Sequence, residues 1–237
     1  MSPPLPPNEA KRIEALRAYR ILDTPAEAVF DDIAEIASAL CQTPIALMTL
    51  IDSDRQWFKA KVGLEGSETP REHAFCAYTI LSSDIMVVED AARDRRFADN
   101  PFVKSDPHVR FYAGAPLIDS SGNALGSLCA VDSKPRQISA QQQRSLAALA
   151  RSVVTHLEFR RASADLAAAL EDLETVHGLL PICAGCKEIR DDKGYWSSVE
   201  EYMGSRADVT FSHGICPTCC KKLYPDIYEQ ISSAKKN

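Results

Sequence analysis

Helical spacing of apolar residues marks three parts of this chain. The first predicted helix covers residues 8–16, and the second runs from about Ala26 to Ala39, because apolar residues recur there every three or four positions. The third begins at Ser139 and continues to about Leu180. The buried stripe of the second helix is expected to contain Phe30, Ile33, Ile36, Ala37 and Leu40.

Shorter apolar runs predict the strands of an antiparallel sheet. Four of them flank two short polar turns and therefore form two hairpins. The predicted strands are 45–51, 56–62, 85–88, 110–118 and 124–131. Between the hairpins, residues 72–81 look helical, and residues 91–107 are irregular and charged. Helices combined with antiparallel hairpins predict an α+β fold in which helices back the sheet.

These elements divide the chain into three predicted parts. The first domain covers residues 1–137, and its closing helix extends along the sheet to about residue 155. A long helix at 138–180 then leads to a small polar module at 181–237. Because this module is poor in apolar residues, we expect it to need a covalent or metal staple to fold.

Two Cys-x-x-Cys pairs in the small module supply the ligands for such a staple. Pairs two residues apart can turn both thiolates toward one metal ion, and two pairs complete a closed tetrahedral zinc site with a structural role. The predicted ligands are Cys183, Cys186, Cys216 and Cys219. A hairpin after the first pair and a helix opened by Pro217 at the second give the outline of a treble-clef zinc finger.

The fourth zinc ligand has alternatives in the sequence. Cys220 adjoins Cys219, and His213 lies three residues before Cys216, so either residue could replace Cys219. The spacing favours Cys219 because it repeats the spacing of the first pair. A redox-active pair and a set of buried unligated thiols are the other interpretations of these cysteines.

Composition places the chain among ordinary globular proteins. It has 237 residues, of which 45% are hydrophobic and 25% charged, and its formal charge of −6 makes nucleic acid an unlikely partner. No apolar run is long enough to cross a membrane, and the proline-rich start lacks the features of a signal peptide. A cytoplasmic location is therefore predicted, and disulfides among Cys41, Cys76 and Cys129 are not expected.

Seven short motifs in the first 155 residues resemble a known domain. They are ILDTP at 21–25, DRQWFK at 54–59, TPR at 69–71, AFCA at 74–77, RFADNP at 96–101, RFYAGAPL at 110–117 and GSLCAVD at 126–132. In this order they resemble the GAF domains of bacterial two-component and cyclic-dinucleotide signalling proteins. The module at 181–237 resembles a small cysteine-rich module found at the end of bacterial sensor and receiver proteins.

The GAF resemblance implies a sensory fold with a pocket between the sheet and the irregular segment that is inserted between the two hairpins. It does not imply a particular ligand, because a fold of this kind serves many functions. The candidate lining residues are Trp57, Phe58, Phe75, Cys76, Phe97, Phe111, Tyr112 and Cys129. For any single aromatic residue among them, a place in the core is the more expected role. Cys76 on the helix and Cys129 on the last strand could approach each other across the pocket. Because nothing adjacent in the sequence predicts a lowered thiol pKa, we expect both to be small buried hydrophobic residues.

Three arginines near this insert have two possible roles. Guanidinium groups bind phosphate and carboxylate ligands, but Arg71, Arg96 and Arg110 also lie close to many carboxylates of the same segment. Pairing within the protein is the simpler expectation for all three.

The end of the long helix carries a coiled-coil pattern. Leucines recur at steps of four and three, with a polar histidine inside the series. The seam consists of Leu166, Leu170, Leu173, His177 and Leu180. It predicts a homodimer through residues 163–180, although a helix packed on another domain would show the same stripe.

No signature of a catalytic domain stands out in the sequence. The leading hypothesis is a sensory protein whose pocket binds a small molecule or responds to a redox or protein cue, and whose helical dimer relays the change to the zinc module and its protein partner. The alternative is a thiol-dependent enzyme of GAF fold, such as a free methionine sulfoxide reductase. Cys76 and Cys129 are the candidate thiols for that chemistry.

Overall fold

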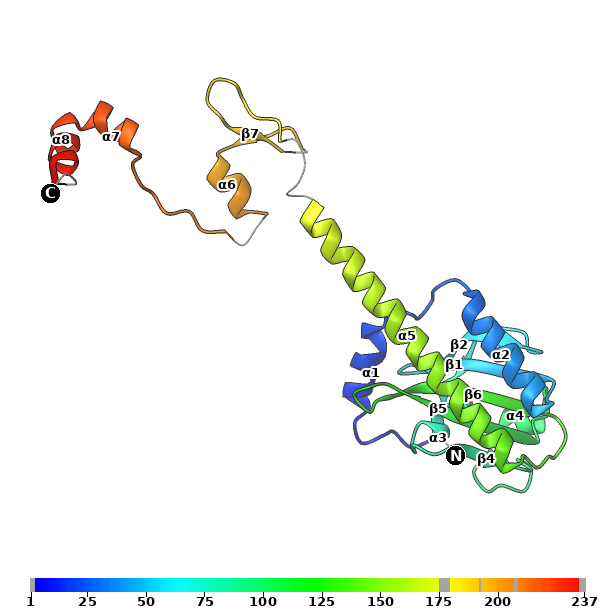
Figure 1. The fold of residues 1–237 in the computed structure, drawn as a ribbon. Helices are drawn as coiled ribbons and strands as arrows, with labels where there is room; N and C mark the ends of the chain where they lie inside the picture. Colours follow the sequence, from blue (N-terminus) through cyan, green and yellow to red (C-terminus); the bar gives the residue numbers. More distant parts are fainter. Residues whose placement is uncertain (1–2, 175–179, 192, 207–208, 235–237) are drawn as a thin grey trace. The chain divides into compact units, whose positions relative to one another are not determined.

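The computed structural model describes residues 3–174, 180–191, 193–206 and 209–234 (Figure 1). The chain forms two compact units, Met1–Leu166 and Ala167–Asn237. Among the described residues, no helix is both long and apolar enough to cross a membrane.

The first unit is built on one antiparallel sheet (Figure 1). Its strands lie in the order β3-β2-β1-β6-β5-β4, and every neighbouring pair is antiparallel. The strands are β1 (Ile45–Ile51), β2 (Arg55–Val62), β3 (Glu68–Pro70), β4 (Met86–Val88), β5 (Phe111–Ile118) and β6 (Ala124–Asp132). Both predicted hairpins, β1–β2 and β5–β6, are confirmed. β3 was not predicted, because three residues are too few for a periodic pattern.

Each face of the sheet has its own core. The helices α1 (Glu9–Ala18), α2 (Ala28–Cys41) and α5 (Ala140–Glu174) cover one face (Figure 1). The segment between β3 and β5, residues 71–110, is the insert. It covers the other face with the 3-10 turn η1 (Arg71–His73), α3 (Cys76–Thr79) and α4 (Pro101–Lys104). Both faces of the sheet are therefore buried. Because successive strand residues point to opposite faces, two aromatic residues adjacent in sequence enter different cores.

Two sequence predictions for the helices are wrong in detail. Ile36, predicted to be buried in α2, has 52% of its surface exposed, because it lies just beyond the edge of the buried stripe. The helix predicted at 72–81 is broken, since the backbone is extended at Ala74 between η1 and α3. The irregular stretch 91–107 also contains α4, which Asn100 caps by accepting a hydrogen bond from the Phe102 N–H.

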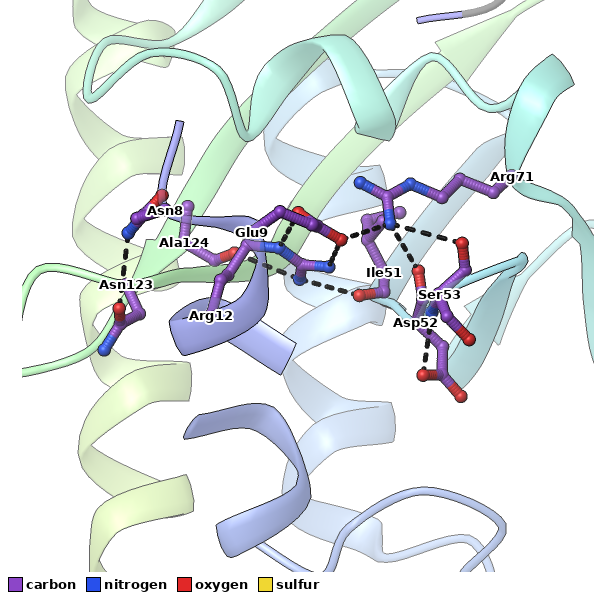
Figure 2. Close-up of polar contacts among 9 residues, drawn as sticks. All are labelled: Asn8, Glu9, Arg12, Ile51, Asp52, Ser53, Arg71, Asn123 and Ala124. Carbon is purple, nitrogen blue, oxygen red and sulfur yellow. Dashed lines mark hydrogen bonds and ion pairs between the residues drawn. The ribbon is translucent and has the colours of Figure 1, made fainter. Parts of the chain in front are cut away.

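A buried ion cluster ties α1 to the ends of the strands and to the insert (Figure 2). The side chain of Arg12 is fully buried, bonds both carboxylate oxygens of Glu9 at 2.8 Å, and donates to the Ile51 carbonyl at 2.7 Å. Arg71, the first residue of η1, bonds the same carboxylate at 2.5 Å and donates to the Asp52 carbonyl at 2.8 Å. One carboxylate therefore links α1 to the segment that leads into α3.

The second unit has little core of its own. It contains β7 (Ile189–Arg190), β8 (Trp196–Ser197), α6 (Val199–Gly204), α7 (Pro217–Leu223) and α8 (Pro225–Ala234). β7 and β8 form the predicted hairpin, in which the Asp191 carboxylate accepts hydrogen bonds from the Lys193 and Tyr195 N–H groups. Its buried residues include Ile189, Tyr202 and Cys220, whereas most of its large apolar side chains are exposed.

Candidate functional site

A cavity of about 220 Å³ lies in the first unit, between the sheet and the insert. The floor comes from β1, β2, β5 and β6, and the walls come from the residues after β2, from the segment before α3, and from the segment between α4 and β5. Most of the lining is apolar. It consists of Ile45, Leu47, Gln56, Phe58, Leu64, Glu65, Thr69, Ala74, Phe75, Cys76, Phe102, Asp106, Pro107, Val109, Tyr112, Cys129 and Val131.

The structure brings together most of the predicted pocket residues. Phe58, Phe75, Cys76, Tyr112 and Cys129 all line the cavity.

Three predicted pocket residues lie elsewhere. Trp57 and Phe111 point to the opposite face, into the core beneath α2 and α5, because neighbouring strand residues face opposite ways. Phe97 lies behind the wall, where its ring stacks on that of Phe75 at a centroid distance of 4.0 Å.

The floor of the cavity holds two thiols among hydroxyl groups. The Sγ atoms of Cys76 and Cys129 are 3.7 Å apart, and the Tyr112 hydroxyl lies 3.4 Å from the Cys76 Sγ. That hydroxyl also bonds Thr79 Oγ1 at 2.6 Å. Ser127 continues the chain of contacts, with its Oγ 3.5 Å from the Tyr112 hydroxyl. These polar groups therefore form one connected set of contacts.

The two thiols have different acidities. Burial opposes ionisation of Cys76, but hydrogen bonds from Cys129, Ser127, Thr49 and Tyr112 to the sulfur outweigh it and lower the pKa of Cys76 to about 6. The hydrogen bond to Cys76, together with burial, raises the pKa of Cys129 well above its ordinary value. A lowered pKa at Cys76 beside a raised pKa at Cys129 favours the Cys76 sulfur as the nucleophile in thiol chemistry.

Gln56 is a pocket residue that the sequence interpretation missed. It is 6% exposed, its Nε2 donates to Thr69 Oγ1 at 3.3 Å, and its Oε1 has no hydrogen-bond partner among the described residues. The period of two along β2 could have identified it, because Gln56 lies two positions before Phe58 and so faces the same side.

The three arginines considered as anion ligands are engaged within the protein. Arg71 pairs with Glu9, and Arg96 pairs with Asp94 at 2.6 Å. Arg110 donates to the Val103 carbonyl at 2.8 Å. None of the three lines the cavity.

The described structure does not gather the four tail cysteines predicted as zinc ligands. Cys216 is the N-cap of α7 and its Sγ accepts from the Cys219 N–H at 3.4 Å, as expected for a pair at a helix start. Backbone N–H groups, first that of Cys219, lower the pKa of Cys216, and that of Cys186 does the same for Cys183. Within the described parts of the chain, no three His, Cys, Asp or Glu side chains form a metal-binding group.

Comparison with known proteins finds a relative that matches more than half of this chain. A stretch of 135 residues is 46% identical to a cyclic di-GMP phosphodiesterase of Pseudomonas aeruginosa. The match includes 57% of this chain but only 23% of that protein, so this chain spans about a quarter of the relative's length.

The solved structures that match this chain are more distant in sequence. The blue-light-absorbing form of the PixJ GAF domain from Thermosynechococcus elongatus is 20% identical, with a TM-score of 0.49 over 61% of this chain and 91% of that one. A free methionine-R-sulfoxide reductase from Neisseria meningitidis, solved with its substrate, is 19% identical, with a TM-score of 0.48 over 65% of this chain and 92% of that one.

The sequence model of the GAF domain matches residues 25–157. This span contains the whole sheet, the insert, the cavity and the part of α5 that packs on the sheet. The chain therefore belongs to the GAF domain family.

Proposed function

We propose that this protein is a cytoplasmic sensor whose GAF cavity binds a small molecule and whose α5 helix relays the binding event. The observation that carries the proposal is the cavity itself, which lies between the sheet and the insert that packs on it. A ligand there contacts both at once, so it favours one position of the insert over others. The relative that is named as a cyclic di-GMP phosphodiesterase supports a signalling role for such a domain.

The relay proposal rests on the exposed seam of α5. Leu146, Val153 and Leu157 pack on the sheet, but further along the helix Leu166 and Leu170 have 62% and 52% of their surfaces exposed. Exposed leucines at helical spacing are typical of a surface that a second chain covers. We therefore propose a homodimer through 163–180. The Leu173 side chain and His177 belong to the same seam but lie outside the described residues.

The output proposal rests on the tail. Zinc bound by Cys183, Cys186, Cys216 and Cys219 would supply a folding energy that the few buried residues of this unit do not. Cys216 lies at the start of α7, where the Cys219 N–H donates to its Sγ, and such a position favours a thiolate. His213 and Cys220 stay as alternative ligands in place of Cys219. The exposed aromatic and aliphatic side chains of the folded module would then contact a protein partner.

Sedimentation of two matched variants tests the sensor proposal. Leu64→Trp places an indole in the cavity wall, whereas Ile36→Trp adds the same group to the exposed face of α2. If occupancy of the cavity changes how two α5 helices associate, Leu64→Trp changes the monomer–dimer equilibrium constant of the full chain and Ile36→Trp does not. Equal constants for both variants and the parent would reject the proposal.

The thiol pair favours a second candidate function, reduction of a small sulfoxide. Two thiols can supply the two electrons that turn free methionine sulfoxide into methionine, leaving a Cys76–Cys129 disulfide and water. The Sγ–Sγ distance of 3.7 Å inside a cavity favours this chemistry. The sequence, however, lacks recognisable cysteine motifs of that enzyme family, so we expect no turnover with a thiol reductant. Turnover that Cys76→Ser and Cys129→Ser both abolish would instead establish the enzyme.

A further inference from the structure

The charged side chains that line the cavity are both acidic. Glu65 and Asp106 line it with exposed side chains, so they mark its opening to solvent. Neither carboxylate has an ion-pair partner within the described ranges. No Lys, Arg or His is among the described residues that line the cavity, and the nearby arginines are held by other groups. The opening therefore repels anions and tolerates neutral or cationic molecules.

The volume sets the size of the occupant. A dry protein cavity of about 150 Å³ holds benzene, and pockets for drug-sized ligands start at about 300 Å³. A cavity of about 220 Å³ therefore fits one ring with a short side chain. A cyclic dinucleotide, with two bases and two phosphates, is both too large and of the wrong charge.

A buried side-chain oxygen of the cavity lining lacks a hydrogen-bond partner among the described residues. The thiols and the Tyr112 hydroxyl are bonded to one another, but the Oε1 of Gln56 accepts no hydrogen bond among the described residues. A buried acceptor without a donor destabilises the protein, so a ligand that donates to Gln56 gains affinity from a group that is already desolvated.

From size, charge and this acceptor together, we infer that the cavity takes a one-ring molecule that is apolar along its body, donates a hydrogen bond to Gln56 and carries no negative charge. The inference rests on the proposed role of the cavity as a ligand site.

Four matched phenyl compounds test this ligand class on the full chain by ligand-observed NMR titration. Tyramine is cationic with a hydroxyl donor, tyrosol is neutral, 4-hydroxyphenylacetate is anionic, and phenethylamine is cationic without the hydroxyl. We expect tyramine and tyrosol to bind at least about fivefold more tightly than the anion, a modest factor because the carboxylates are exposed. Tyramine should also exceed phenethylamine by about three- to tenfold through the bond to Gln56.

Variants assign each preference to its residue. Gln56→Met should remove the difference between tyramine and phenethylamine, and the pair Glu65→Gln with Asp106→Asn should remove the discrimination against the anion. Leu64→Trp should abolish binding of all four compounds.

Three results would overturn the inference: no binding by tyramine or tyrosol, equal or tighter binding of the anion, or displacement of tyramine by cyclic di-GMP. These titrations report cavity occupancy whether or not α5 responds. A bound tyramine that leaves the dimer unchanged would therefore contradict the relay and leave the ligand class standing.

Discussion

Glu9 is the residue through which α1, the strand ends and the insert are joined (Figure 2). Burial by itself would raise its pKa, but hydrogen bonds from Arg12 and Arg71 lower the pKa to about 2. A carboxyl with a lowered folded-state pKa stabilises the protein above its ordinary pKa of 4.5, and that contribution is lost as the pH falls toward 2.

Replacing Glu9 should therefore have a pH-dependent cost. We expect Glu9→Gln to lower the free energy of unfolding by about 2 kcal/mol at neutral pH, since it leaves two buried arginines without their carboxylate. The deficit should shrink steadily below pH 4.5. Urea unfolding at pH 7, 4.5 and 3 measures it, with Glu14→Gln on the exposed side of α1 as the control. A deficit of the same size at pH 3 would contradict the role of the ionised carboxylate.

Gly63 holds the loop that carries Leu64 and Glu65 over the cavity. Its φ is +69°, and a Cβ at this position would lie 2.0 Å from the Pro44 carbonyl oxygen. Gly66 in the same loop has a φ of +89° but open space around it, so Gly66→Ala measures backbone strain without a clash. We expect Gly63→Ala to cost at least about 1 kcal/mol more than Gly66→Ala in unfolding free energy. Equal costs would show that the contact with Pro44 is not a constraint.

Which aromatic residues reach the cavity could be predicted only in part. The motif residues Phe58 and Tyr112 line it, while their neighbours Trp57 and Phe111 enter the other core. The period of two separates these neighbours but does not say which face a pocket occupies, because both faces of this sheet are buried. That Cys76 could approach Cys129 was anticipated. The hydroxyl groups around them were not, since Thr49, Thr79 and Ser127 look unremarkable in sequence.

At the scale of elements, the strong periodic patterns gave the right helices and strands. Both hairpins, α1, α2 and the start of α5 follow the predicted ranges closely, and the amphipathic pattern is clearest in α2. The insert was predicted less well. Its elements are only three or four residues long, and contacts such as the Arg71–Glu9 pair determine where they end.

The α5 seam gives a prediction at this scale. Leu170→Asp should weaken dimerisation by at least about tenfold, because it places two like charges in an apolar interface. Ala168→Asp adds the same charge on another side of the helix and should have little effect. Sedimentation equilibrium of both variants and the parent measures this. The parent could stay monomeric at tens of micromolar, or Leu170→Asp could leave the dimerisation constant unchanged. Either result would mean that the seam packs within one chain.

At the scale of the whole molecule, zinc is expected to hold the tail folded. Cys186→Ser should reduce bound zinc from about one ion per chain to nearly none, since a closed structural site needs all its ligands. The tail of this variant should become sensitive to protease while the GAF unit stays intact. Cys41→Ser is the control, because that thiol is buried in the core of the first unit.

The identity of the fourth ligand follows from a second pair of variants. Cys220→Ser and His213→Ala should both retain zinc if Cys219 is the ligand. Loss of zinc in either variant would reassign the site, and one zinc per chain retained in Cys186→Ser would reject it.

Hydrogen exchange along α5 tests most directly whether the cavity communicates with the rest of the chain. Exchange is compared by mass spectrometry among the full-length parent, Leu64→Trp and Ile36→Trp. If occupancy of the cavity is relayed, filling it with Leu64→Trp changes the protection of residues 158–174, and Ile36→Trp leaves them as in the parent. Changes confined to the residues that line the cavity, with α5 identical in all three proteins, would contradict the account of this protein as a sensor.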